Sequence, residues 1–210
     1  MRPCCERYLG LGDQRVTARF ISLLKLYARL QDVQGCIVEL GVASGESIRT
    51  WAHFAEFHPG HVRRVYGFDT FAGFPVIGGE DGPLIPAIGK RVGGETDLRP
   101  RPLGLREVNV PPQIYLVEGD IVETLPKYAF YGSQLALVYF DADLYAPTKC
   151  GLDVLWPRLA PGGLFVFDEY GQEAWPGETK AVDDFLSTHV ELKLERLTME
   201  SGPTACVVKP

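Results

Sequence analysis

Carboxylates that end apolar segments are the residues of this chain with the clearest chemical meaning. Asp141 lies in LALVYFDAD, and Asp168 with Glu169 ends LFVFDE. Neighbouring strands lie about 4.8 Å apart, so we expect these three carboxylates to converge. Anions this close repel one another unless a cation or a proton holds them together. Oxygen ligands suit a hard cation, most simply Mg²⁺; helix capping and ion pairs with Lys149 or Lys180 are the structural alternative.

Three earlier apolar segments also end in acids. Glu39 is in CIVEL, Asp69 ends VYGFD, and Asp120 ends IYLVEGD. In an open α/β sheet, ligands bind outside the carboxyl ends of the parallel strands. The acids therefore predict a ligand site along one edge of a sheet.

A glycine turn follows the first of these strands, in the segment ELGVASGES. Gly41 and Gly45 allow close approach of a ligand to the backbone, and the amides at the following helix start would receive a carboxylate or phosphate. A tight turn that binds nothing is the alternative. The spacing Gly-x-x-x-Gly differs from Gly-x-Gly-x-x-Gly, which disfavours a dinucleotide pyrophosphate.

Asp69 and Asp120 each allow two interpretations. Asp69 would accept hydrogen bonds from the two hydroxyls of a ribose, or it caps the turn at Thr70 and Phe71. Asp120 would face a base, or it caps the helix expected over 121–128. The binding interpretations together predict a ligand that contains a nucleoside.

The elements that position these residues alternate between strand and helix. This pattern predicts βαβ units in a doubly wound, mostly parallel, Rossmann-like sheet of seven strands. The segments 190–198 and 204–209 flank MESGP and predict a closing antiparallel hairpin. The other strands are expected at 36–41, 62–69, 113–118, 134–141 and 163–168, and helices at 17–30, 45–57, 121–128, 146–158 and 178–188.

Length and composition predict one α/β domain over 1–210, with an N-terminal helical segment at 1–34. The Gly- and Pro-rich stretch 74–112 is too long for an ordinary loop and predicts a lid or a substrate loop. A net charge of -6 disfavours a nucleic-acid partner. Five scattered cysteines and no apolar run of about 18 residues predict a cytoplasmic protein without a membrane span.

The chain resembles the class I S-adenosylmethionine-dependent methyltransferases, specifically the macrocin O-methyltransferase (TylF/MycF) family, which methylates deoxysugars of bacterial natural products. The resemblance implies that family's fold, S-adenosylmethionine as cofactor and a sugar or similar polyol hydroxyl as small-molecule acceptor. The matching segments are VELGVASGES, VYGFDTFAGFP, VEGDIVETLP, VYFDADLYAPTKCGLDVLWPRLAPGGLFVFDEYG and PGETKAVDDF.

The resemblance also implies a role for each matching residue. The methionine end of the cofactor would contact Glu39, Gly41, Gly45 and Ser47. Its ribose would contact Asp69, Phe71 would flank the nucleoside, and Asp120 with Ile121 would hold the adenine. Asp141, Asp168 and Glu169 would bind the metal, although the family usually has Asp-Asp-Tyr where this chain has Asp168-Glu169-Tyr170.

Methyl transfer to a hydroxyl needs a proton acceptor, for which Asp141 and Asp143 are available. Catechol-type relatives carry a lysine where this chain has Leu144, which favours Asp141 as both ligand and base. A metal-independent methyltransferase acting on an amine or a phenol is one alternative. A non-catalytic nucleoside-binding module is another, and the oligomeric state, homo-oligomers included, stays open.

Overall fold

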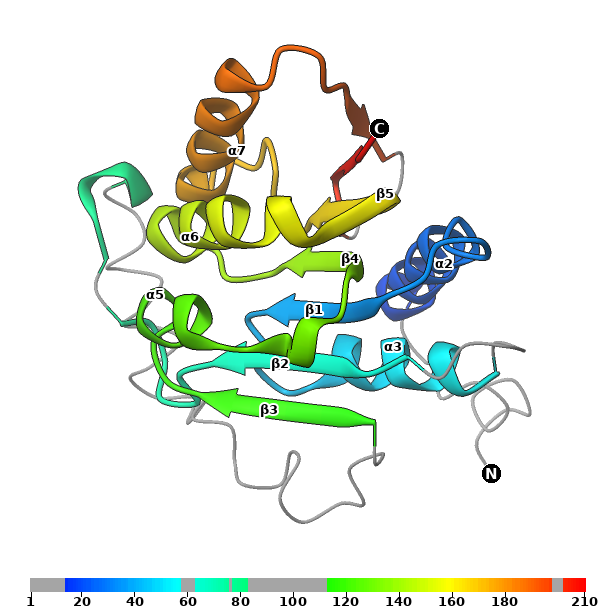
Figure 1. Ribbon diagram of the computed structural model, residues 1–210. Helices are drawn as coiled ribbons and strands as arrows, with labels where there is room; N and C mark the ends of the chain where they lie inside the picture. The colour runs from blue at the N-terminus through cyan, green and yellow to red at the C-terminus, as the bar shows by residue number, and fades with distance from the viewer. Residues whose placement is uncertain (1–13, 58–62, 76, 83–112, 198–201) are drawn as a thin grey trace.

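The computed structural model describes residues 14–57, 63–75, 77–82, 113–197 and 202–210. Seven strands form one sheet in the order β3-β2-β1-β4-β5-β7-β6. The first five strands along the chain pair in parallel, so β1 to β4 point to one edge, at the left of Figure 1. The predicted fold class is confirmed. The strands are β1 (Cys36–Leu40), β2 (Val65–Asp69), β3 (Ile114–Glu118), β4 (Leu135–Phe140), β5 (Leu159–Phe167), β6 (Leu194–Arg196) and β7 (Ala205–Val208).

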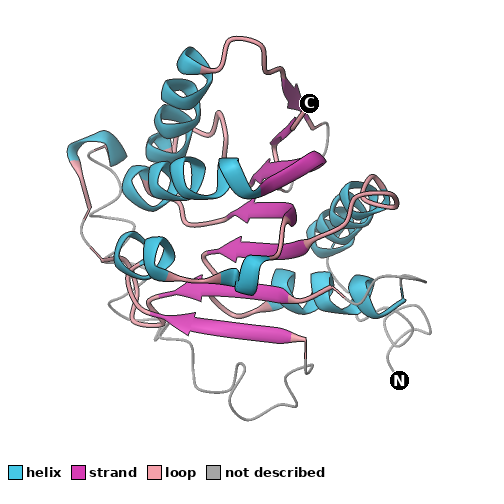
Figure 2. Cartoon of the chain, viewed as in Figure 1, coloured by secondary structure: helices cyan, strands magenta, loops and turns pink. Residues whose placement is uncertain are grey.

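Helices alternate with strands along most of the chain and cover both faces of the sheet (Figure 2). Helices α2 (Gln14–Ala28) and α3 (Glu46–Phe57) pack on one face, while α5 (Ile121–Thr124), α6 (Tyr145–Leu155) and α7 (Pro176–Thr188) pack on the other. Both central strands, β1 and β4, are buried at every position. Burial at every position is typical of the strands of parallel sheets covered on both sides.

Two predicted helices end earlier than expected, and proline explains both ends. The helix expected over 121–128 gives way to a 3-10 turn at Leu125–Lys127, and α6 gives way to one at Trp156–Arg158. Pro126 and Pro157 lie in these turns and cannot donate the backbone hydrogen bond that a continuing α-helix requires. Strand β5 then begins at Leu159, earlier than the predicted 163.

The antiparallel end of the sheet is confirmed, with β7 paired to both β5 and β6. Residues 198–201 of the connection lie outside the described part of the chain, as do residues 1–13 of the N-terminal segment. Most of the 74–112 stretch, residues 76 and 83–112, also lies outside it. The described beginning of that stretch contains Asp81, a buried residue whose carboxylate accepts the N–H of Tyr145 at the start of α6 at 2.6 Å.

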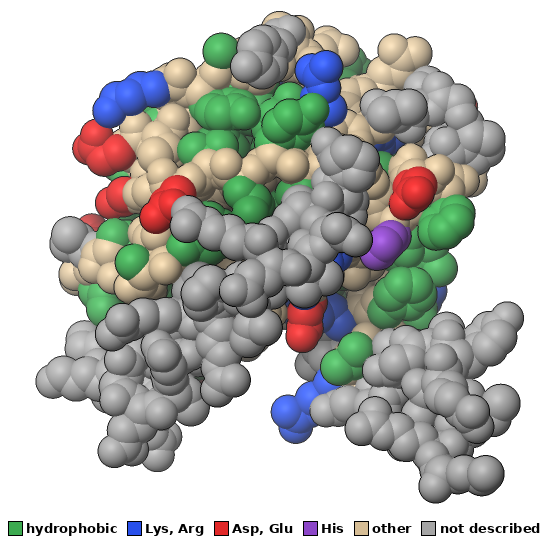
Figure 3. Space-filling model, turned by 90° about the horizontal axis from the view of Figure 1, so that it is seen from below, with side chains coloured by type: hydrophobic (Ala, Val, Ile, Leu, Met, Phe, Trp, Pro, Cys, Tyr) green, Lys and Arg blue, Asp and Glu red, His purple; other side chains and the backbone are tan. Residues whose placement is uncertain are grey.

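The described helices include none with the length and apolar character needed to cross a membrane. Figure 3 shows one face of the molecule from below, where described Lys and Arg side chains stand singly among hydrophobic and acidic ones. A stripe of basic residues, which would follow a phosphate backbone, is not visible on the described part of that face.

Arg63 connects the end of the N-terminal helical segment to the sheet. Its buried guanidinium donates to the carbonyl oxygens of Leu30 at 2.7 Å, Val33 at 2.6 Å and Gly35 at 3.0 Å. We expect Arg63→Leu to lower the free energy of unfolding by about 3 kcal/mol in urea titrations, because the three carbonyl oxygens would lose their buried hydrogen-bond donor. The exposed Arg64 provides the control: Arg64→Leu should change stability by about 0.5 kcal/mol. Equal losses in the two variants would contradict this role.

Candidate functional site

The acids at the carboxyl edge continue the strand ladder beyond the strands themselves. The N–H of Asp141 donates to the carbonyl of Leu40 at 2.8 Å, and the N–H of Asp168 donates to that of Phe140 at 3.0 Å. Side chains alternate between faces along a strand, so Asp141 shares the side of Tyr139, which packs toward α2 and α3. The end of β4 therefore presents Asp141 to the α2–α3 side.

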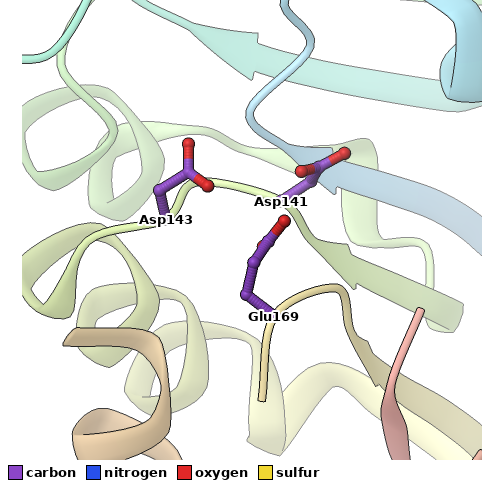
Figure 4. A group of neighbouring side chains, drawn as sticks. All are labelled: Asp141, Asp143 and Glu169. Carbon is purple, nitrogen blue, oxygen red and sulfur yellow. The ribbon is translucent and has the colours of Figure 1, made fainter. Parts of the chain in front are cut away.

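Three carboxylates converge at this edge. Donor oxygens of Asp141, Asp143 and Glu169 all lie within 4.8 Å of one another. Figure 4 shows Asp141 and Asp143 reaching the group from the segment after β4, and Glu169 from the segment after β5. Asp143 has a φ of 64°, a left-handed conformation that Asp tolerates better than most residues. We call this group of three the carboxylate group.

Asp168 lies beside the carboxylate group and is held by other partners. The hydroxyl of Tyr139 donates to its Oδ1, and the guanidinium of Arg19 donates to both of its oxygens at 2.9 Å. Two of the three predicted metal ligands, Asp141 and Glu169, thus meet in the group. The third position there is taken by Asp143, which the sequence had suggested only as a proton acceptor.

Arg19 of helix α2 is a site residue that sequence reasoning missed. Its second nitrogen, Nη2, donates to Asp141 Oδ2 at 2.8 Å, so one guanidinium joins the ends of β4 and β5. The available signal was its spacing: Arg19 stands four residues before the buried Leu23, on the face that α2 turns toward the sheet. An arginine on such a face needs hydrogen-bond acceptors, and strand-end carboxylates are suitable ones.

Glu178 of helix α7 is a second residue whose role was missed. It is fully buried, and its Oε1 accepts the backbone N–H of Glu169 at 2.9 Å. This bond orients the segment that carries the Glu169 carboxylate. The sequence had matched Glu178 within PGETKAVDDF without assigning it a contact.

Burial and mutual repulsion raise the pKa values of these acids. Desolvation, and then the charge of Asp168, raise the pKa of Asp143 to about 7. The same two causes raise the pKa values of Asp141 and Glu169 well above their usual range, while the Arg19 charge opposes the shift at Asp141. The positive charge near Asp141, Asp143 and Glu169 is therefore too small to stabilise all three as carboxylates.

The carboxylate group fits a divalent cation by two observations. Its donors are all oxygens at mutual distances that one ion can span, and Glu169 Oε2 is buried without a hydrogen-bond partner among the described residues. A cation would satisfy that oxygen and relieve the repulsion that raises the pKa values. Asp141, Asp143, Asp168 and Glu169 are the residues from which its ligands would come.

The glycine turn after β1 lies at the same carboxyl edge of the sheet as the carboxylate group. Gly41 has a φ of 88°, and a Cβ placed there would lie 1.9 Å from the carbonyl oxygen of Asp141. Gly45 has a φ of 78° and opens helix α3. The absence of a side chain at Gly41 therefore allows the end of β1 to approach the end of β4.

Glu39 lies under this turn and is fully buried. Its Oε1 accepts the hydroxyl of Ser47 at 2.8 Å, while its Oε2 has no hydrogen-bond partner in the described part of the chain. Burial raises the pKa of Glu39 to about 8. A buried carboxylate with one unsatisfied oxygen would accept a cationic group of a ligand.

Asp69 performs the capping role considered from the sequence. Its Oδ2 accepts the N–H groups of Val42 at 2.7 Å and Ala43 at 2.9 Å, and its Oδ1 accepts that of Phe71 at 2.7 Å. The carboxylate thereby joins the glycine turn to the segment after β2. Contact with a ribose is a separate role that these bonds do not test, and Oδ1 retains capacity for another donor.

Asp120 and Ile121 stand at the start of α5. Asp120 Oδ1 accepts the N–H of Val122 at 2.9 Å, which confirms the capping interpretation. Ile121 is buried in the core beneath the helix. Phe71 is half-buried with a φ of 48° and packs against the core on the α2–α3 side. Their contacts with a nucleoside stay predictions.

Sequence relatives of the chain are methyltransferases. It is 30% identical over 148 residues to the 8-demethyl-8-(2,3-dimethoxy-alpha-L-rhamnosyl)-tetracenomycin-C 4'-O-methyltransferase of Streptomyces olivaceus, covering 68% of this chain and 55% of that protein. It is 27% identical over 163 residues to the mycinamicin III 3''-O-methyltransferase of Micromonospora griseorubida, covering 75% and 62%. The chain thus spans less than two thirds of either relative.

The structural comparison agrees with the sequence relatives. The crystal structure of CalS11, a calicheamicin methyltransferase, is similar with a TM-score of 0.74 and 30% identity over 99% of this chain and 86% of that one. A second structure of CalS11 describes it as a TDP-rhamnose 3'-O-methyltransferase. The family model for the methyltransferase domain matches residues 38–170, the segment that runs from the glycine turn to the last acids of the site. The chain belongs to this methyltransferase family and has the class I methyltransferase fold.

Proposed function

We propose that the protein is an S-adenosylmethionine-dependent O-methyltransferase that uses Mg²⁺ to methylate a hydroxyl of a sugar or similar polyol in bacterial natural-product biosynthesis. The observation that carries this proposal is the carboxylate group, with its unsatisfied Glu169 oxygen, one strand away from the glycine turn. The names of two relatives support the acceptor class, since the tetracenomycin enzyme is named for a rhamnosyl compound and CalS11 for TDP-rhamnose.

The cofactor would lie across the carboxyl ends of β1, β2 and β3. At its methionine end, Glu39 offers an unsatisfied buried oxygen to the ammonium, beside Gly41, Gly45 and Ser47. At its other end, Asp69 would accept the ribose hydroxyls. Phe71 would flank the nucleoside, and Asp120 with Ile121 would border the adenine.

The metal ligands in this proposal are Asp141, Asp168 and Glu169, with Asp143 at the same group. When bound, Mg²⁺ would act as a Lewis acid that lowers the pKa of an acceptor hydroxyl and fixes its orientation. Arg19 and Tyr139 orient Asp168, while Glu178 orients the backbone of Glu169. Asp141 was expected to act as both ligand and base.

Asp143 is favoured over Asp141 as the proton acceptor. It is half-buried in the carboxylate group, and among the described residues it is not one of the two acids that Arg19 bonds. Asp141 is already engaged by Arg19. In the reaction, the acceptor O–H proton would pass to Asp143, the oxygen–methyl bond would form, and the sulfur–methyl bond of the cofactor would break with its electrons on sulfur.

Metal removal tests this function. With labelled S-adenosylmethionine and a panel of nucleotide-linked deoxysugars, we expect EDTA to lower turnover by about 100-fold or more, because the acceptor hydroxyl loses its activation. Added Mg²⁺ should restore it, and EDTA saturated beforehand with Mg²⁺ should have no effect. Cofactor affinity should change by no more than a few-fold, since the acids Glu39 and Asp69 lie on other strands.

Other results would favour the alternatives. Full activity in EDTA, on an amine or a phenol as well as a sugar, would indicate a metal-independent methyltransferase. Cofactor binding without product from any sugar, phenol or amine acceptor would indicate the non-catalytic nucleoside-binding module.

A further inference from the structure

Arg19 is the basic residue of the described chain that bonds directly to two acids of the site. Both terminal nitrogens of its guanidinium bond to the site: Nη1 donates to the two oxygens of Asp168, and Nη2 donates to one oxygen of Asp141. The guanidinium also lies over the ring of Tyr139, and its central carbon is 5.7 Å from the ring centroid. Arg19 is therefore held from three directions, by a ring and two carboxylates.

These contacts leave the acids able to bind a cation. A carboxylate has two oxygens with about four lone pairs, so an oxygen that accepts from a guanidinium can still coordinate a metal. The donors of Asp141, Asp143 and Glu169 lie within 4.8 Å of one another while Arg19 is in place. The arginine and the carboxylate group thus coexist in one arrangement.

We propose that Arg19 is a positioning residue of the metal site, which orients Asp141 and Asp168 from helix α2 and so makes the N-terminal helix part of that site. The inference rests on the metal-dependent function proposed above. Groups that hydrogen-bond to metal ligands fix the orientation of those ligands, and their loss typically costs about 10- to 100-fold in metal affinity or activity. The planar fork of arginine suits this task because it can bond two carboxylates at fixed angles.

A competing role for the same contacts is that Arg19 occupies the place of the metal. The two roles predict opposite changes in metal affinity when Arg19 is replaced. Loss of a positioning residue weakens binding, whereas loss of a competing cation strengthens it. Metal affinity therefore separates the roles without reference to turnover.

The experiment titrates Mn²⁺ into the full chain saturated with S-adenosylhomocysteine, with free Mn²⁺ measured by electron paramagnetic resonance. We expect Arg19→Gln to weaken Mn²⁺ binding by about 10- to 100-fold. Arg19→Lys should fall between this variant and the natural chain, since lysine keeps the charge but lacks the fork. Arg29, just beyond α2 and paired with Glu195 at 2.8 Å, provides the control, and Arg29→Gln should bind Mn²⁺ as the natural chain does.

Each outcome decides one claim. Unchanged or tighter Mn²⁺ binding by Arg19→Gln would overturn the positioning role and leave the proposed function intact. If the natural chain itself binds no Mn²⁺, the metal part of the proposed function is wrong and the inference is wrong with it. Should Arg19→Gln not fold, by circular dichroism, the lysine variant decides, and natural affinity in that variant contradicts the proposal.

Discussion

Asp141→Asn should lower kcat by about 10³-fold, the largest catalytic effect expected from one substitution in this chain. The amide keeps the size of the side chain but removes its charge. One oxygen of Asp141 accepts from Arg19, and the residue also joins Asp143 and Glu169 in the carboxylate group. An amide NH₂ would direct a donor either at the guanidinium or at the cation position.

The measurement is steady-state kinetics on the best acceptor, with cofactor affinity by calorimetry. S-adenosylmethionine affinity should stay within a few-fold, because Asp141 is not among the proposed cofactor contacts. The control is Asp153→Asn, which removes an exposed acid of α6 that pairs with Lys149. Turnover retained in Asp141→Asn would rule out an essential role for this carboxylate.

Gly41→Ala should produce the largest combined loss of stability and cofactor binding. The new Cβ would lie 1.9 Å from the carbonyl oxygen of Asp141 and 2.5 Å from its carbonyl carbon, at a φ of 88°. Backbone atoms cannot move aside as a flexible side chain can, so β1 and β4 would separate where the site is built. We expect the free energy of unfolding to fall by about 4 kcal/mol. Cofactor affinity should fall by more than about 10-fold, since the turn itself moves.

Gly73 is a matched control for the backbone conformation. It has a φ of 89°, but a Cβ placed there would meet no atom of the described residues within 4 Å. Gly73→Ala should cost only the conformational strain, about 1 kcal/mol. The difference between the two variants, measured by urea unfolding and cofactor calorimetry, isolates the contact between β1 and β4. Equal losses in both would show that this contact has no special importance.

The edge that carries the site was predictable because its signals are local. Each strand is a short apolar run, burial on both faces makes that run continuous, and the acid that follows marks the carboxyl end. Parallel pairing then places all the acids on one edge of the sheet. The signal for the correct ends of α5 and α6 was also local, because Pro126 and Pro157 lie in the turns that directly follow these helices.

The role of each individual acid could not be read from the local sequence pattern. Asp69 and Asp120 were each compatible with capping or with ligand contact. The structure shows capping bonds from both, to the N–H groups of Val42, Ala43 and Phe71 and of Val122 respectively. A capping residue at a strand end looks the same in sequence as a ligand-binding one, because both need an acid in the same place.

What the sequence alone determined is the doubly wound sheet and the edge where its acids gather. Only the tertiary structure decided how those acids are grouped: Asp143 enters the carboxylate group through its left-handed backbone, and Asp168 turns to Arg19 and Tyr139. The partner Arg19 lies 122 positions from Asp141. Strand and helix follow from the periodicity of neighbouring residues. The meeting of distant charged side chains depends on how α2 packs across the sheet, which no local pattern encodes.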